Sequence, residues 1–183
     1  MECVCSGINH KMRTRFWCAV SATAILLWGS ASANDQVTIE ITGMIEVECG
    51  ISDMPPTVNL GDLTAVGSRT IPFRVHCNTP FAYSLQSREG GLRHASAQHA
   101  GAGFLLLLPY SVDIRIPTNA GTIVNQCASQ SLAADAPGCT FSNSGNGVAI
   151  QQNSSLTISW SISGKPVAGS YMDVLTLEMR PQL

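Results

Sequence analysis

Apolar and polar side chains alternate along the sequence after residue 36. From residue 37 to residue 51 every odd position is apolar, glycine or cysteine, whereas the even positions are mostly Thr and Glu. The odd positions are Val37, Ile39, Ile41, Gly43, Ile45, Val47, Cys49 and Ile51. A period of two is typical of a β-strand with one buried face. The pattern predicts one long strand, or two strands in line, over residues 37–51.

The same signal recurs in shorter stretches along the rest of the chain. Strands are predicted over residues 57–60, 69–77, 82–86, 104–116, 147–150, 156–162 and 172–180, with Pro, Gly, Asn and Ser between them. After residue 33 no stretch has the apolar spacing of an amphipathic helix. About seven short strands joined by turns are typical of an immunoglobulin-like (Ig-like) β-sandwich. We therefore expect an all-β fold in one domain.

Two regions are predicted to be rich in loops. Residues 87–103 and 118–155 contain too few apolar side chains for regular buried elements. Such loops can carry recognition, but exposed connections are their usual role in an exported domain.

The last predicted strand ends close to the end of the sequence. Residues 164–179 read GKPVAGSYMDVLTLEM, a proline–glycine turn followed by an alternating strand, and only Arg180, Pro181, Gln182 and Leu183 follow. An Ig-like sheet normally has one more strand after this one. We expect the sandwich to lack its last strand and to expose part of its core in a groove.

The first 33 residues have the features of a signal peptide. Lys11, Arg13 and Arg15 precede an apolar stretch over residues 16–29, and Ala31-Ser32-Ala33 is a small-residue cleavage site. We expect the mature chain to begin at Asn34 and translation to start at Met12, since Met12 would begin a conventional signal peptide by itself. The apolar stretch is shorter than the roughly 20 residues of a membrane span, so no membrane insertion is expected.

Cleavage would leave four of the seven cysteines, Cys49, Cys77, Cys127 and Cys139. An even set in an oxidising compartment predicts two disulfides. Among three connectivities, 49–77 with 127–139 makes the fewest topological demands, and the entropic model credits such bridges with about 3 to 3.5 kcal/mol each. A metal site is the alternative, but no C-x-x-C or H-x-x-x-H spacing accompanies these cysteines.

Charge and motifs argue against several functional classes. After residue 33 there are seven basic and eleven acidic residues, a net charge of about −4 without a basic stripe, so no nucleic-acid partner is expected. No spaced nucleophile–base signature is present, so we expect neither enzymatic activity nor a cofactor. His94 and His99 are expected to be solvated in a polar loop, and His76 to point outward from its strand. Trp160 and Tyr171 are expected to pack in the core or at its rim rather than bind sugar.

Several stretches together resemble the spore coat protein U domain family, a branch of chaperone–usher pilus subunits. They are the alternating segment that runs into Cys49-Gly50-Ile51-Ser52, the sequence Val58-Asn59-Leu60-Gly61, residues 71–77, and the terminal PVAGSYMDVLTLEM. The likeness covers most of the chain after residue 33, and its specific motifs lie toward the two ends.

The resemblance implies assembly by donor-strand complementation. In such subunits a periplasmic chaperone lends the missing strand, and the N-terminal extension of a neighbouring pilus subunit later replaces it at an outer-membrane usher. Carried over to this sequence, Cys49 and Cys77 form the early disulfide and residues 34–45 form the extension. Val37, Ile39, Ile41, Gly43 and Ile45 are its donor stripe, and Leu175, Leu177 and Met179 belong to the acceptor groove of the domain at residues 46–183.

The resemblance thus predicts a subunit of a surface fibre, exported to the periplasm and then to the cell surface, with roles in adhesion or biofilm formation. The terminal strand lacks the aromatic residue often found there, Pro109 interrupts the predicted strand at 104–116, and the loop from Cys127 to Cys139 looks like an addition. The alternative function is a self-contained secreted Ig-like binding module or adhesin. In that case residues 37–45 would form the first strand of the domain's own sheet.

Overall fold

The largest sheet has five antiparallel strands. The computed structural model describes residues 36–99, 101–133, 139 and 141–182. The strand order is β1-β2-β10-β7-β8. The strands are β1 (Cys49–Ser52), β2 (Gly67–Cys77), β10 (Ala149–Trp160), β7 (Ser111–Thr118) and β8 (Gly121–Ala128). The register between β10 and β2 shifts between Ala149 and Gln152, a β-bulge.

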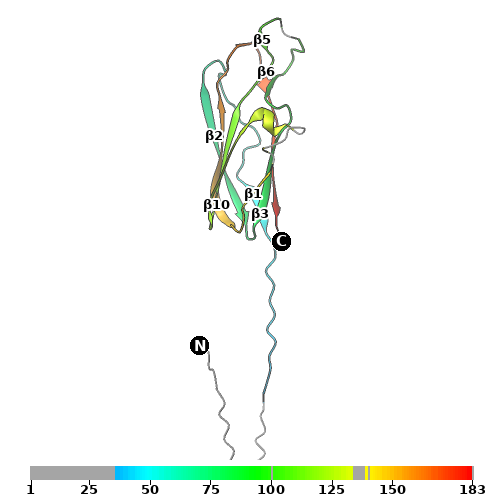
Figure 1. The fold of residues 1–183 in the computed structure, drawn as a ribbon, viewed down its shortest axis with the longest axis vertical. Coiled ribbons are helices and arrows are strands. Elements are labelled where there is room, and N and C mark those ends of the chain that lie inside the picture. Colours follow the sequence, from blue (N-terminus) through cyan, green and yellow to red (C-terminus); the bar gives the residue numbers. More distant parts are fainter. Residues whose placement is uncertain (1–35, 100, 134–138, 140, 183) are drawn as a thin grey trace, which may run out of the picture. The chain divides into compact units, whose positions relative to one another are not determined.

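Two three-stranded sheets form the opposite layer (Figure 1). One has the order β13-β3-β9, with β13 (Leu175–Pro181), β3 (Phe81–Ser87) and β9 (Phe141–Asn143). The other has the order β12-β4-β6, with β12 (Tyr171–Met172), β4 (Leu92–His94) and β6 (Leu107–Leu108). Because β4 follows β3 and β12 precedes β13 along the chain, the two sheets continue one another.

Shorter elements complete the fold. A parallel pair joins β11 (Lys165–Pro166) to β5 (Phe104–Leu105), and a single 3-10 turn, η1 (Ser129–Leu132), follows β8. Among the residues that the structure describes, no helix is long and apolar enough to cross a bilayer. The predicted signal peptide lies outside the described residues.

The core lies between the two layers. Along β2 the buried side chains are Ile71, Phe73, Val75 and Cys77, and the intervening residues are exposed or half-buried. β3 and β10 alternate in the same way, with Phe81, Tyr83, Leu85, Leu156, Ile158 and Trp160 inward. The period of two in the sequence therefore sets which face of each strand enters the core.

The strand order is that of an Ig-like sandwich. In chain order β1, β2, β3, β7, β10 and β13 take the places of strands A to F, and β1-β2-β10-β7 reproduces the A-B-E-D sheet. β3 and β13 pair as strands C and F do. The protein is an all-β sandwich, as predicted, and no described strand takes the place of strand G.

Both disulfides are present with the favoured pairing. Cys49–Cys77 joins opposed residues of β1 and β2 whose Cα atoms are 4.0 Å apart, and Cys127–Cys139 joins β8 to the segment before β9. Structural disulfides persist in oxidising compartments. The two bridges therefore point to an extracytoplasmic environment.

Most strand predictions are confirmed and some are wrong. The strands predicted at 156–162 and 172–180 correspond to the end of β10 and to β12 with β13. The strands predicted at 69–77 and 82–86 are β2 and β3, but of residues 37–51 only 49–51 form part of a strand. The strand predicted at 104–116 divides into β5, β6 and β7, and Pro109, which has no N–H to donate to a ladder, lies in the gap between β6 and β7. Both predicted loop regions also contain strands that were not expected, namely β4 in the first and β8 and β9 in the second, whereas the strand predicted at 147–150 coincides with the start of β10.

Replacing both Cys49 and Cys77 with alanine should cost about 3 to 3.5 kcal/mol in the free energy of unfolding, because the unfolded chain regains the freedom of a 28-residue loop. The matched control replaces Cys127 and Cys139, which close a shorter loop of 12 residues, and should cost about 0.7 kcal/mol less. Urea denaturation of both variants measures the difference. The reverse order of stabilities would contradict this account of the two bridges.

Candidate functional site

A groove of about 1140 Å³ runs between two stretches of chain in the sandwich. Residues 54–64 form one wall, and residues 166–175 with Leu177 form the other. The floor consists of the core side chains Ile71, Leu85, Leu92, Leu108, Leu156 and Ile158, together with Tyr110. The groove therefore opens directly onto the hydrophobic core.

One edge of β13 borders this groove without a partner. β13 pairs with β3 from Leu175 opposite Ser87 to Pro181 opposite Phe81, and no strand in the described part of the chain pairs with its other edge. Leu175, Leu177 and Met179 are half-buried, and the residues between them are exposed. An unpaired strand beside an apolar opening is a template for another chain.

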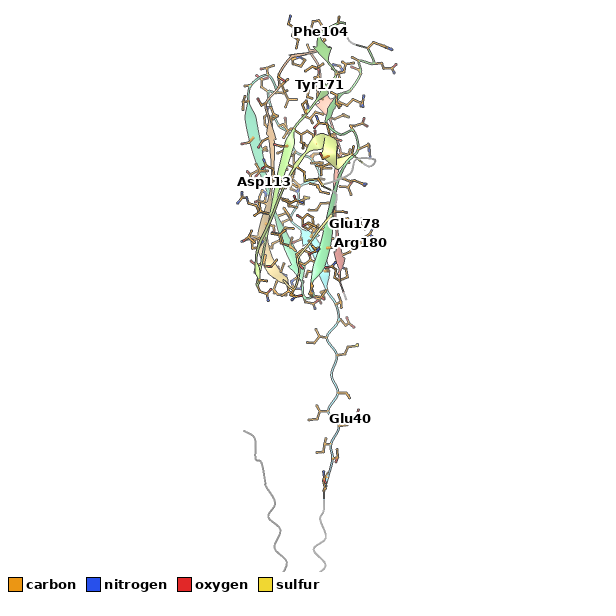
Figure 2. All side chains as sticks on the ribbon, viewed as in Figure 1. Glu40, Phe104, Asp113, Tyr171, Glu178 and Arg180 are labelled. Carbon is orange, nitrogen blue, oxygen red and sulfur yellow. A yellow bond between two sulfur atoms is a disulfide. The ribbon has the colours of Figure 1, made fainter. Side chains whose placement is uncertain are left out.

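The residues predicted for the acceptor groove share one face of β13. Leu175 and Leu177 line the groove, and Met179 lies on the same face beyond the lining residues. The exposed face carries Glu178 and Arg180, which are paired at 2.9 Å (Figure 2). This ion pair lowers the pKa of Glu178 and raises that of Arg180.

The wall at residues 54–64 forms no strand, so the prediction of a strand at 57–60 is wrong. Pro55 and Pro56 have no N–H to donate. The side chains of Asn59 and Asp62 each accept a bond from the backbone N–H two residues further on, at 2.8 and 2.9 Å. For Asp62 this backbone bond, with a second from the Thr64 hydroxyl, lowers the pKa. Local bonds of this kind compete with strand pairing, so the wall leaves the groove open.

The other wall is held by His94 and Tyr171. The Tyr171 hydroxyl lies 2.8 Å from the Val167 carbonyl oxygen, and the two rings meet edge to face with centroids 5.0 Å apart. His94 Nδ1 accepts bonds from two following backbone N–H groups, so its Nε2 carries the proton and donates to the Ala168 carbonyl at 3.2 Å. A Cβ on Gly169 would lie 2.3 Å from that nitrogen. Only glycine therefore fits at position 169.

A polar cluster forms where β12 passes into β13. Asp173 Oδ2 accepts bonds from the hydroxyls of Ser87 at 2.5 Å and Tyr110 at 2.6 Å, and Oδ1 accepts from the Glu89 N–H at 3.1 Å. Burial, followed by the bond to Asp173 and the charge of that carboxylate, raises the pKa of Tyr110. The cluster ties the wall of the groove to the end of β3 and to the residue before β7.

The alternating N-terminal stripe forms no strand in the structure. Val37 and Ile39 are 75% exposed, Ile41 is 91% exposed and Ile45 is 88% exposed. Figure 2 shows side chains on both sides of the extended chain around Glu40. Residues 37–48, the first part of the strand predicted over residues 37–51, therefore form no strand in this structure. Gly43 also lies outside any strand.

The structure also describes the remaining candidate residues, which are three histidines and Trp160. His94 is only 7% exposed, so the expectation of a solvated side chain is wrong, whereas His99 is exposed. His76 is half-buried on the outer face of β2, as predicted. Its Nε2 lies 3.3 Å from a carboxylate oxygen of Glu48. Trp160 is in the core at 6% exposed. Within the described residues no group of three or more His, Cys, Asp or Glu side chains could hold a metal ion.

Comparison with models of protein families found no match to this chain, and comparison with curated proteins found none either.

Sequence reasoning missed the polar residues that shape the groove. Asp173 interrupts an otherwise alternating strand, and that interruption is the one signal that could have singled it out. Tyr110 follows Pro109 at a predicted irregularity. No local sequence pattern marks Ser87 or His94, because their hydrogen-bond partners lie 86 and 74 residues away in the sequence.

The raised pKa of Tyr110 predicts that the protein loses stability at alkaline pH. The pKa of this side chain is raised in the folded protein, so its contribution is complete below the unfolded value of 10.0 and is lost as the pH rises above that value. Tyr110→Phe should flatten the decline of the free energy of unfolding above pH 10, by an amount that approaches about 1.4 kcal/mol per pH unit. Urea denaturation between pH 8 and 11 measures both slopes, and Tyr83, whose pKa burial also raises, contributes equally to each protein. Equal slopes would contradict the buried state of the Tyr110 hydroxyl.

Proposed function

We propose that this chain is an exported structural subunit that assembles into a surface fibre by strand exchange. In this function the segment Val37–Ile45 of one copy enters the groove of the next and pairs with the free edge of β13. The subunit resembles those of chaperone–usher pili, and the predicted signal peptide at residues 1–33 directs its export.

The chief support is an open groove and an unpaired apolar segment in one chain. The groove reaches core side chains and borders the free edge of β13, where strand G of an Ig-like sandwich would lie. Nine residues in extended conformation span about 30 Å, longer than the seven-residue β13 beside the groove. The donor segment therefore has the length that the groove requires.

The pattern of the segment fits such a groove. Alternate side chains of an added strand enter pockets while its backbone bonds to the sheet edge. Val37, Ile39, Ile41 and Ile45 lie on one face of an extended chain, and burial of such a side chain contributes about 1.5–3 kcal/mol. Gly43, which lacks a side chain, suits a position where the two backbones approach closely.

An open groove also requires a temporary occupant. Exposed apolar surface beside a free strand edge promotes aggregation. A periplasmic chaperone that lends a strand until the next subunit arrives at an outer-membrane usher would supply this protection. These partners follow from the proposed class of subunit.

Two charged substitutions test the exchange. Ile41→Arg should abolish donation and Leu177→Arg should abolish acceptance, because each would place a charge in the apolar groove. The matched controls are Thr42→Arg and Thr176→Arg, which lie on the opposite faces of the same two segments. Sedimentation velocity should show multimers for the unmodified chain and both controls, and monomers for each of the two other variants.

Mixing the two defective variants provides the decisive readout. The Leu177→Arg chain keeps an intact donor and the Ile41→Arg chain keeps an intact groove, so their mixture should form dimers and nothing larger. Ile41 is almost fully exposed, so its substitution tests donation without disturbing the core. An unmodified chain that stays monomeric at all concentrations would instead favour a self-contained binding module.

A further inference from the structure

Three hydrogen bonds to Asn78 hold the chain immediately before β1. The backbone N–H of Asn78 donates to the Glu48 carbonyl at 3.0 Å, and Asn78 Oδ1 accepts from the Glu48 N–H at 3.0 Å. Asn78 Nδ2 donates to the Glu46 carbonyl at 2.7 Å. The asparagine thus extends the pairing of β1 with β2 beyond the last pair of residues, Cys49 and Cys77.

The turn that carries Asn78 also holds the end of β13. The Gln182 N–H donates to the Pro80 carbonyl at 2.7 Å, and the Thr79 hydroxyl donates to the Gln182 carbonyl at 3.1 Å. The turn at residues 78–80 therefore fixes both the entry into β1 and the exit from β13. The Cys49–Cys77 disulfide lies immediately beside it.

These bonds oppose a turn at residues 46–48. For residues 37–45 to fold back beside β1, those three residues would have to form a tight hairpin, and two-residue hairpins need positive φ angles. Among the described residues other than glycine, only Asp53 and Gln151 have positive φ. A turn at 46–48 would also break the bonds from Asn78 to Glu46 and Glu48.

Insertion of the N-terminal segment into the groove of its own chain would have a large advantage over insertion into the groove of another copy. A short tether gives an effective concentration of about millimolar, far above the concentration of separate subunits. Without a restraint, a chain whose extension could turn back would fill its own groove and would not assemble.

We propose that Asn78 is a positioning residue that prevents the N-terminal segment from entering its own groove, so that the acceptor is a second copy of this chain. This inference rests on the proposed strand exchange and specifies its partner. Asn78 acts through the backbone of Glu46 and Glu48 and does not line the groove.

Isotope-resolved photo-cross-linking tests the inference. An aliphatic diazirine amino acid replaces Ile41, and equal amounts of ¹⁴N- and ¹⁵N-labelled chains are mixed before irradiation. Cross-links from residue 41 to groove peptides are then sorted by mass spectrometry. Exchange between copies makes about half of them mixed in isotope, and insertion within one chain makes none.

The Asn78→Ala chain should lose mixed cross-links, from about one half to below about one tenth of the total, because the tethered segment then competes at its effective concentration. The matched control is Asn119→Ala. Asn119 makes the same reciprocal pair of bonds, to Val148: its backbone N–H donates to the Val148 carbonyl at 3.1 Å, and its Oδ1 accepts from the Val148 N–H at 2.9 Å. This pair lies far from residue 46 in the sequence. The Asn119→Ala chain should keep the unmodified ratio.

A second variant keeps Asn78 and adds a turn. Glu46→Asn with Val47→Gly supplies an Asn-Gly sequence at two exposed positions, and it should also shift the cross-links to single-isotope pairs. An unmodified ratio in both variants would overturn the role of Asn78 and leave the proposed function standing. Absence of any groove cross-link in the unmodified chain would overturn the proposed function itself.

Discussion

The free edge of β13 is the constraint on which the rest of this structure depends. Its unpaired backbone groups lie beside an apolar groove that reaches the core, so one end of the sandwich is incomplete with respect to both hydrogen bonds and packing. An unpaired strand edge beside apolar surface is a template for pairing with another chain. The proposed strand exchange would supply partners at this edge, and it connects the fold to the proposed function.

Both walls are built to keep that edge available. On one side, residues 54–64 contain two prolines and local side-chain bonds and form no strand with β13. On the other side, His94, Tyr171 and the carboxylate of Asp173 hold the chain that leads into β13. These polar contacts join elements far apart in the sequence, so the open groove is specified by the whole domain rather than by one loop.

Periodicity in the sequence was enough to predict the strands that bury one face, and the period of two in β2 and β3 identifies their inward side chains correctly. It failed at residues 37–48, because alternation shows that a segment is suited to a sheet and does not show that the segment pairs within its own chain. It failed again for β4 and β8, whose neighbours along the chain are polar. The apolar positions of the groove were predictable from β13, whereas Asp173, Tyr110 and His94 act through contacts that no local pattern records.

Amide hydrogen exchange during assembly tests the central claim most directly. The account predicts that amides of residues 37–45 exchange rapidly in the monomer and become protected in the multimer, together with those β13 amides that are not bonded to β3. Protection at both segments should appear at the same chain concentration. Multimers in which residues 37–45 still exchange as rapidly as in the monomer would contradict the account.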